Sequence, residues 1–173
     1  MSHVLTVGIS DCAVSGDPNA VITTHALGSC VGLLIYDPVA RVGGLLHYML
    51  PDSTMDKDRA AQKPFMFADT GIPLLFHTAY KAGARKERIQ VTALGGAQIL
   101  GTNDSFSIGK RNLMSMRKIL WKAGVMLHHE EVGGTSPRTA RLEVASGKIL
   151  VSFGRGQHEV HQGITERREA NGL

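Results

Sequence analysis

The sequence contains few cysteines and few aromatic residues: Cys12 and Cys30 are its two cysteines, and aromatic side chains make up 5% of the chain. Two cysteines do not form a disulfide framework, and so few aromatic residues argue against a carbohydrate-binding or base-stacking surface. The N-terminus lacks a basic region followed by an apolar core, which argues against a secretory signal. No apolar run approaches the ~20 residues that span a bilayer. These absences predict a cytoplasmic protein, without membrane insertion, in which a free thiol persists.

The sequence also lacks the patterns of metal, nucleotide and nucleic-acid sites. His128 and His129 are adjacent in a predicted strand and point to opposite faces, and His158 and His161 supply two ligands where zinc needs four. The glycine-containing segment 108–112 matches neither the Rossmann fingerprint nor the P-loop. Its basic residues begin a helix without an aromatic platform. We therefore expect no metal, no nucleotide cofactor and no nucleic-acid partner.

The length of 173 residues predicts one folded domain. We expect residues 1–153 to form a single domain, followed by a polar C-terminal tail over residues 154–173. Helices are predicted over residues 70–82, capped by Asp69, and over residues 107–123, capped by Ser107. Strands outnumber helices, and antiparallel connections outnumber crossovers. The expected fold is α/β, close to α+β: a layered sandwich of mostly antiparallel or mixed β-sheets with two main helices. Strands are predicted over residues 4–9, 20–24, 30–36, 41–50, 88–94, 125–132, 138–145 and 148–153.

The most informative segment joins Cys30 and His47 through a hairpin. Asp37 and Pro38 occupy the first and second positions preferred in a type I turn. A symmetric fold about residues 38–39 places Cys30 directly opposite His47, where Cβ atoms are about 4.5–5.5 Å apart. A bulge at the Gly43–Gly44 pair would instead send His47 to the other face. A thiol beside an imidazole is the minimum equipment of a cysteine nucleophile.

These residues define a candidate catalytic group. Cys30 is the nucleophile, His47 the base that activates it, and Thr24 the residue that orients the imidazole. Gly28 and Ser29 form a bend before Cys30, where backbone N–H groups are available to stabilise an oxyanion and position substrate. The alternative for an isolated cysteine is a buried apolar side chain, since free cysteines are among the most buried residues.

Cys12 follows Asp11, has no histidine near it in the sequence, and is interpreted as structural. The net charge of +4 is compatible with an acidic partner, although cations scattered over solvated helix faces explain it as well.

Three segments of the chain resemble the chemoreceptor glutamine deamidase family, CheD. The resemblance begins at residues 24–31 and continues through residues 36–44 and 47–51. Weaker glycine motifs at residues 95–97, 108–112 and 132–134 extend it over nearly the whole chain except the tail. The sequence departs from the family pattern over residues 131–138, where Pro137 stands in place of an expected glycine.

The resemblance implies a protein-glutamine glutaminase that converts glutamine side chains of methyl-accepting chemotaxis receptors to glutamate through a cysteine thioester. Cys30, His47 and Thr24 match the family's catalytic residues. The implied fold is similar to that of deamidase toxins of the cytotoxic necrotizing factor type. No cofactor is implied, because a thiolate and an imidazole perform both half-reactions. The implied partners are the receptors, at whose cytoplasmic arrays the enzyme acts, and the phosphatase CheC, which some members bind.

Two other functions stay open at the level of sequence. One is a different Cys–His acyl-transfer enzyme, such as a peptidase or a transglutaminase-like enzyme. The other is a binding module that regulates a chemotaxis phosphatase without catalysis.

Overall fold

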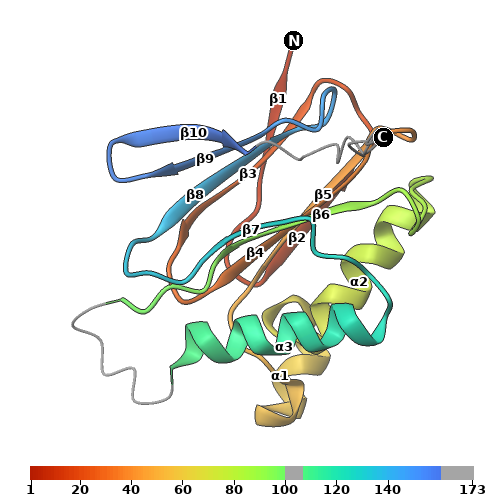
Figure 1. Ribbon diagram of the computed structural model, residues 1–173. Helices are drawn as coiled ribbons and strands as arrows, with labels where there is room; N and C mark the ends of the chain where they lie inside the picture. Colours follow the sequence, from red (N-terminus) through yellow and green to blue (C-terminus); the bar gives the residue numbers. More distant parts are fainter. Residues whose placement is uncertain (100–106, 161–173) are drawn as a thin grey trace, which may run out of the picture.

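The protein forms three layers, with two β-sheets stacked face to face and helices on the outer face of one of them (Figure 1). The computed structural model describes residues 1–99 and 107–160. Sheet A has the order β1 (His3–Thr6), β3 (Ala20–Leu27), β8 (Arg138–Glu143), β9 (Ile149–Phe153) and β10 (Gly156–Val160). Sheet B has the order β2 (Asp11–Ser15), β5 (Val42–Tyr48), β4 (Val31–Asp37), β6 (Gln90–Gly95) and β7 (His129–Val132). The helices are α1 (Lys57–Gln62), α2 (Ala68–Lys81) and α3 (Ile108–Lys122), with short 3₁₀ turns at Ser53–Met55 and Pro64–Met66.

Sheet B is the central layer because its middle strands are apolar on both faces. Every residue of β4 and β5 is buried. One face packs on α2 and α3, with Leu33 and Leu46 in that core, and the other packs on sheet A, with Leu34 and Leu45 between the sheets. The two-sided burial predicted for this hairpin is confirmed, as is the layered, mainly antiparallel α/β architecture; parallel pairing joins β1 to β3 and β6 to β7.

The Gly43–Gly44 pair lets both neighbouring layers approach β5. A Cβ atom on Gly43 would lie 3.0 Å from Leu142 of sheet A, and one on Gly44 would lie 3.0 Å from Leu75 of α2. The pairing of β4 with β5 runs without interruption past these glycines, so the chain carries no bulge there.

The register of the β4–β5 hairpin differs by two residues from the symmetric fold expected from the sequence. Asp37 pairs with Val42, and Gly32, not Cys30, stands opposite His47. The turn has the expected length but lies one residue further along the chain, because the Asp37 carboxylate accepts hydrogen bonds from the N–H groups of Val39 and Ala40, at 2.9 and 3.0 Å, and Arg41 takes a φ of 53°. An even shift preserves the face of each side chain, whereas a shift of one residue would reverse it.

Asp37 also ties this turn to the segment between α2 and β6. Its Oδ2 accepts from the N–H of Arg85 at 2.9 Å and from Nη2 of Arg88 at 2.8 Å, and the Asp37 side chain is fully buried. Burial alone would raise the pKa of Asp37, but hydrogen bonds from Arg88 and from three backbone N–H groups outweigh it and hold the pKa below its ordinary range. The carboxylate therefore stays charged and fixes the turn that positions β5.

Several predicted boundaries differ from the structure. Helix α2 begins at Ala68, two residues before the predicted start, and the Asp69 carboxylate accepts from Ser53 rather than capping the helix. Ser107 does precede α3, but its side chain makes no capping hydrogen bond and its φ is 48°. Strand β2 was not predicted.

Sheet A continues past the predicted start of the tail at residue 154. Strand β10 (Gly156–Val160) pairs with β9 along its full length, and Val160 is buried between the sheets. The tail was predicted over residues 154–173 because these residues show no apolar alternation; backbone pairing to β9 supplies the order that the pattern lacks. Residues 161–173 lie outside the described residues.

Removal of the Asp37 charge should destabilise the protein strongly. We expect Asp37→Asn to lower the free energy of unfolding by about 3 kcal/mol, because it leaves buried donors without their acceptor. Since the folded-state pKa is depressed, this stabilisation is present above about pH 4 and is lost as the pH falls below it. Urea unfolding at neutral pH and near pH 3.5 measures both effects.

The matched control for Asp37→Asn is Glu130→Gln, which removes the exposed ion pair between Glu130 and Arg117. An exposed pair contributes less than about 1 kcal/mol. Equal losses in the two variants would contradict the assigned role of Asp37.

Candidate active site

The site lies where the chain crosses from sheet A to sheet B. Strand β3 ends at Leu27, a half-buried bend covers residues 28–30, and β4 begins at Val31. The pairing of β3 with β8 shifts register between Thr24 and Leu27, and Ala26 in this bulge has a φ of 55°, which is unusual for a residue with a side chain. The bulge and the bend turn the chain from one sheet into the other, so Thr24 and Cys30 approach β5 from different layers.

Thr24 and His47 meet between the sheets. Oγ1 of Thr24 lies 2.8 Å from Nδ1 of His47, and the same hydroxyl donates to the carbonyl oxygen of Val7 at 2.7 Å. A threonine hydroxyl has one proton. Since that proton points to Val7, the proton in the Thr24–His47 bond belongs to Nδ1, and Nε2 carries the free lone pair. Thr24 thus orients the imidazole and selects the tautomer whose Nε2 is able to accept a proton.

Burial keeps the imidazole neutral. His47 is 1% exposed, and this desolvation lowers its pKa to about 4. Nε2 is buried and has no hydrogen-bond partner among the described residues. An unpartnered buried nitrogen is costly in a purely structural histidine, and a group kept as a base in a desolvated site is typical of catalytic positions.

Cys30 lies on the same side of sheet B as His47. Its side chain packs against the core between the sheets, the core that contains Leu45, two residues before His47 on β5. Extending the hairpin register by one pair places Cys30 opposite Met49, which makes Cys30 and His47 diagonal neighbours. Diagonal residues have Cα atoms about 7–8 Å apart, within the combined reach of the two side chains. The direct opposition expected from the sequence was wrong, but the shared face is retained.

The two thiols differ in surroundings. Burial raises the pKa of the Cys30 thiol, and a hydrogen bond from its own backbone N–H partly opposes the rise. Burial and the neighbouring Asp11 raise the pKa of Cys12 to about 12. Cys12 stands opposite Leu46 and packs in the core beneath the helices, on the other face of sheet B from His47. The imidazole therefore lies on the face of sheet B that Cys30 occupies and not on that of Cys12.

The bend over residues 28–30 is held by its carbonyl groups. Gly96 N–H donates to Cys30 O and Ala97 N–H donates to Gly28 O, each at 2.8 Å. Gly95 must be a glycine here, because its φ is 96° and a Cβ atom would lie 2.4 Å from the Cys30 carbonyl oxygen. Among backbone carbonyls of residues 1–99 and 107–160, none accepts from Ser29 N–H or Cys30 N–H. Fixed carbonyls, together with N–H groups that no described backbone carbonyl engages, are the arrangement that an oxyanion-binding bend requires.

Asn112 of α3 is a supporting residue that the sequence reasoning missed. It is fully buried, and its Nδ2 donates to Ser29 O at 3.0 Å and to Met49 O at 2.7 Å. The backbone carbonyl oxygen of Asn112 accepts from the Tyr48 hydroxyl at 2.9 Å. One side chain thereby joins the residue before Cys30 to the residue two beyond His47. An asparagine among the apolar residues of an amphipathic helix was the signal that could have revealed it.

The described part of the chain lacks the features of a metal site and of a membrane-spanning helix. Residues 1–99 and 107–160 contain no group of three His, Cys, Asp or Glu side chains that could hold a metal ion. No helix in the same residues is long and apolar enough to cross a bilayer.

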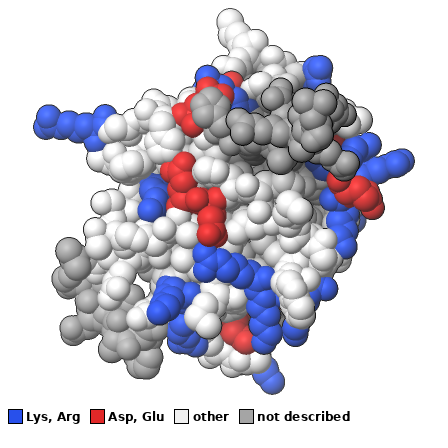
Figure 2. Space-filling model, in the orientation of Figure 1, with Lys and Arg blue, Asp and Glu red and all other residues white. Residues whose placement is uncertain are grey.

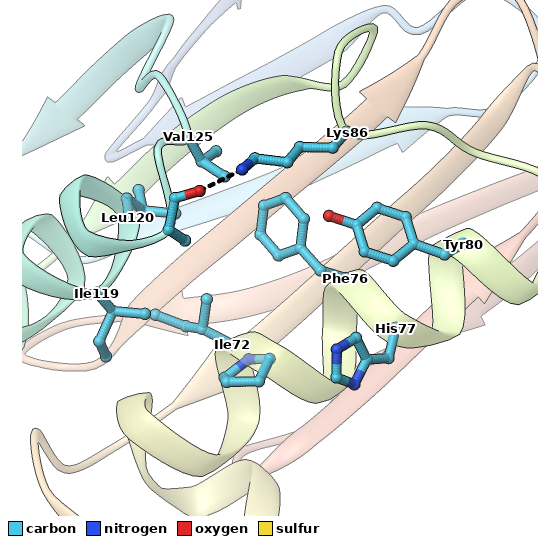
Figure 3. Close-up of a pocket in the computed structure, with 10 residues that line it drawn as sticks. Ile72, Phe76, His77, Tyr80, Lys86, Ile119, Leu120 and Val125 are labelled. Atoms are coloured by element: carbon cyan, nitrogen blue, oxygen red, sulfur yellow. Dashed lines mark hydrogen bonds between the residues drawn. The ribbon is translucent and has the colours of Figure 1, made fainter.

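A separate cavity of about 190 Å³ lies between α2 and α3 (Figure 3). Phe76 and Tyr80 of α2 face Ile119 and Leu120 of α3 across it, and Lys86 donates to the carbonyl oxygen of Ala123 at its rim. Neither Cys30 nor His47 lines this cavity, so it is distinct from the Thr24–His47 site.

The fold and the site define a two-sheet α/β protein with a cysteine bend beside a buried Thr–His pair. Comparison with known proteins identifies the family. The family model of CheD, described as CheD chemotactic sensory transduction, matches residues 49–153. The chain therefore belongs to the CheD family.

Curated relatives cover most of the chain. The sequence is 51% identical to the "Probable chemoreceptor glutamine deamidase CheD" of Solibacter usitatus, over 90% of this chain and 92% of the relative. It is 49% identical to "CheD 1" of Syntrophus aciditrophicus, over 87% of this chain and 94% of the relative. "CheD 2" of Anaeromyxobacter dehalogenans is 50% identical, over 87% of this chain and 95% of the relative. A solved structure, Bacillus licheniformis YfiH, has a TM-score of 0.39 at 18% identity over 72% of this chain and 50% of that chain, which is too distant to bear on fold or function.

Loss of the Asn112 amide should destabilise the protein and loosen the Cys30 bend. We expect Asn112→Leu to lower the free energy of unfolding by about 2–4 kcal/mol, because two buried carbonyl groups lose their donor. Ser115→Ala is the matched control on the same helix, since Ser115 donates one hydrogen bond, to Pro51 O, from a half-buried position. We expect it to cost about 1 kcal/mol. Denaturant unfolding compares the two; losses of equal size would exclude a special role for Asn112.

Proposed function

We propose that the protein deamidates glutamine side chains of chemoreceptors, with Cys30 as nucleophile, His47 as acid and base, and Thr24 as the residue that orients His47. The observation that carries the proposal is the Thr24–His47 hydrogen bond, since it leaves an unpartnered basic Nε2 on the face that Cys30 shares. The relatives' name, chemoreceptor glutamine deamidase, supports the substrate and the reaction.

The reaction begins with transfer of the Cys30 proton to Nε2 of His47. The thiolate attacks the carboxamide carbon of glutamine, and the N–H groups of Ser29 and Cys30, with Gly28 shaping the bend, stabilise the oxyanion. His47 then returns the proton to the leaving nitrogen, so the C–N bond breaks and ammonia departs. Water attacks the thioester with His47 as base, which releases glutamate and restores the thiol. The chain's own residues perform every proton transfer in this sequence.

The low pKa of His47 and the raised pKa of Cys30 favour a neutral resting pair. Both charged forms are disfavoured by burial, so an imidazolium–thiolate pair is not the resting state of this site. Substrate binding therefore precedes ionisation, and proton transfer accompanies attack on the amide. A neutral thiol is also less prone to reaction with small electrophiles than a thiolate.

We further propose that residues 1–160 act as one deamidase domain at the cytoplasmic part of receptor arrays. Partnership with the phosphatase CheC stays a prediction from the family resemblance. A peptidase or a transglutaminase-like enzyme would use the same Cys–His chemistry, but would cleave or cross-link the chain. Mass spectrometry of the treated receptor distinguishes them, because deamidation adds about 1 Da per glutamine, with ammonia as the other product.

Replacement of Cys30 should abolish the reaction. We expect Cys30→Ala to eliminate ammonia release from a purified receptor fragment and Cys12→Ala to leave it within about two-fold of the wild type, because Cys12 has no base beside it. Iodoacetamide labelling followed by peptide mapping gives an independent measure, with Cys30 alkylated faster than Cys12. Equal loss of activity in both variants, with folding retained, would refute the assignment.

The acid limb of the pH profile should lie unusually low. Because the pKa of His47 is about 4, Nε2 stays unprotonated through neutral pH, and kcat/KM should fall only as the pH approaches that value. We expect near-constant activity from about pH 7 to about pH 5.5. A loss centred near the ordinary imidazole pKa of about 6.5 would mean that His47 is solvated. Circular dichroism at each pH separates inactivation from unfolding.

A further inference from the structure

The outward side of α3 combines exposed apolar side chains with positive charge. Met114 is 61% exposed and Trp121 is 79% exposed, among the most exposed large apolar residues of the described chain. At 100° per residue the two fall within one narrow sector of the helix, opposite the buried residues Leu113, Met116 and Leu120. Large exposed apolar side chains on one face mark an interaction site more often than scattered ones do.

Cations flank this apolar pair on both sides. Helix α3 contains five cations and no acidic residue. The positions of Lys110 and Arg117 border the Met114–Trp121 sector on one side, and those of Arg111, Lys118 and Lys122 border it on the other. We call these seven residues the α3 outer face: Lys110, Arg111, Met114, Arg117, Lys118, Trp121 and Lys122. Figure 2 shows Lys and Arg gathered over the part of the surface where α3 lies.

Part of this charge is balanced within the chain. Arg117 forms an ion pair with the exposed carboxylate of Glu130 at 2.9 Å, and Lys118 and Arg111 interact electrostatically with the carboxylate of Asp52. Five cations against two such carboxylates leave the face positive. An apolar centre with a charged rim is the composition of a protein–protein interface, in which Trp and Arg contribute most. Because the rim carries positive charge, it favours a partner that carries carboxylates.

The inner side of the same helix supports the bend of the candidate active site from the helix-covered face of sheet B. Asn112 donates to Ser29 O, the residue before Cys30, so a partner on the α3 outer face lies about one helix diameter, roughly 10 Å, from the backbone of this bend. The Cys30 and His47 side chains lie on the other face of sheet B. The apolar pair and its cations extend over three turns, about 16 Å along the axis, which matches the contact made by a second helix. The face is therefore placed to hold a helical segment of the substrate other than the one that carries the reacting glutamine.

We propose that the α3 outer face docks an acidic helical segment of the substrate protein. The proposal rests on the proposed function for the identity of the substrate. An apolar ridge of the partner helix packs on Met114 and Trp121, and its carboxylates lie against the cations of Lys110, Arg111 and Lys118. Docking in this manner contributes to KM for an intact helical substrate and not to the chemistry at Cys30.

Charge reversal and truncation on this face test the proposal. Lys118→Glu and Trp121→Ala are compared with wild type on a purified cytoplasmic receptor fragment and on a short uncharged glutamine peptide. Arg155→Glu, in the turn between β9 and β10, is the matched control for charge. We expect KM for the receptor fragment to rise by about 10-fold or more in both α3 variants, with kcat within about two-fold and peptide turnover unchanged. Salt should raise KM less for Lys118→Glu than for wild type.

A binding measurement makes the docking test independent of catalysis. The receptor fragment is titrated against Cys30→Ala, with and without Lys118→Glu, and weaker binding in the double variant supports the docking face. Unchanged binding, or equal losses on fragment and peptide, overturns it. The same variants are also tested for binding to vesicles of anionic phospholipid. A loss of binding to the vesicles, with binding to the receptor fragment unchanged, would assign the face to a membrane and overturn the proposal. A wild type that binds the fragment through α3 but releases no ammonia would refute the proposed function while retaining the docking face.

Discussion

The buried hydrogen bond between Thr24 and His47 is the interaction on which the site depends, because it joins the two sheets at the point where the chain passes from one to the other. The core between the layers consists mainly of apolar side chains, and apolar packing fixes separation but not the orientation of an imidazole. Thr24 supplies that orientation, and the carbonyl of Val7 supplies it for Thr24. The same desolvation that makes the layers stable lowers the pKa of His47 and keeps Nε2 unprotonated.

Two fixed points hold the reacting groups in register with this bond. The buried carboxylate of Asp37 sets the position of the β4–β5 turn and therefore which residue of β5 reaches the sheet interface. Asn112 then binds Ser29 O and Met49 O together from the helix layer. Helix α3 thus serves the site from its inner side, and the docking proposal assigns its outer side to substrate. Chemistry and recognition are separated by helix α3 and sheet B.

Most elements could be predicted because their residues carry a strong local pattern. The two-sided apolar hairpin and both main helices follow from periodicity, and the shared face of Cys30 and His47 follows from turn chemistry. The register was off by two because turn arithmetic does not include the hydrogen bonds that the Asp37 side chain makes to the loop. Strands β2 and β10 were missed because short, polar strands are ordered by pairing with a neighbour and have little pattern of their own.

The sequence by itself determined the layered fold class, the resemblance to the CheD family and the residues on which a catalytic proposal rests. It did so because local propensity, turn residues and a specific motif are read along the chain. Only the tertiary structure decided the tautomer of His47, the separation of Cys12 from the imidazole and the bridging role of Asn112. Each of these depends on contacts between residues far apart in sequence, and burial, which gives such contacts their strength, exists only once the layers have packed.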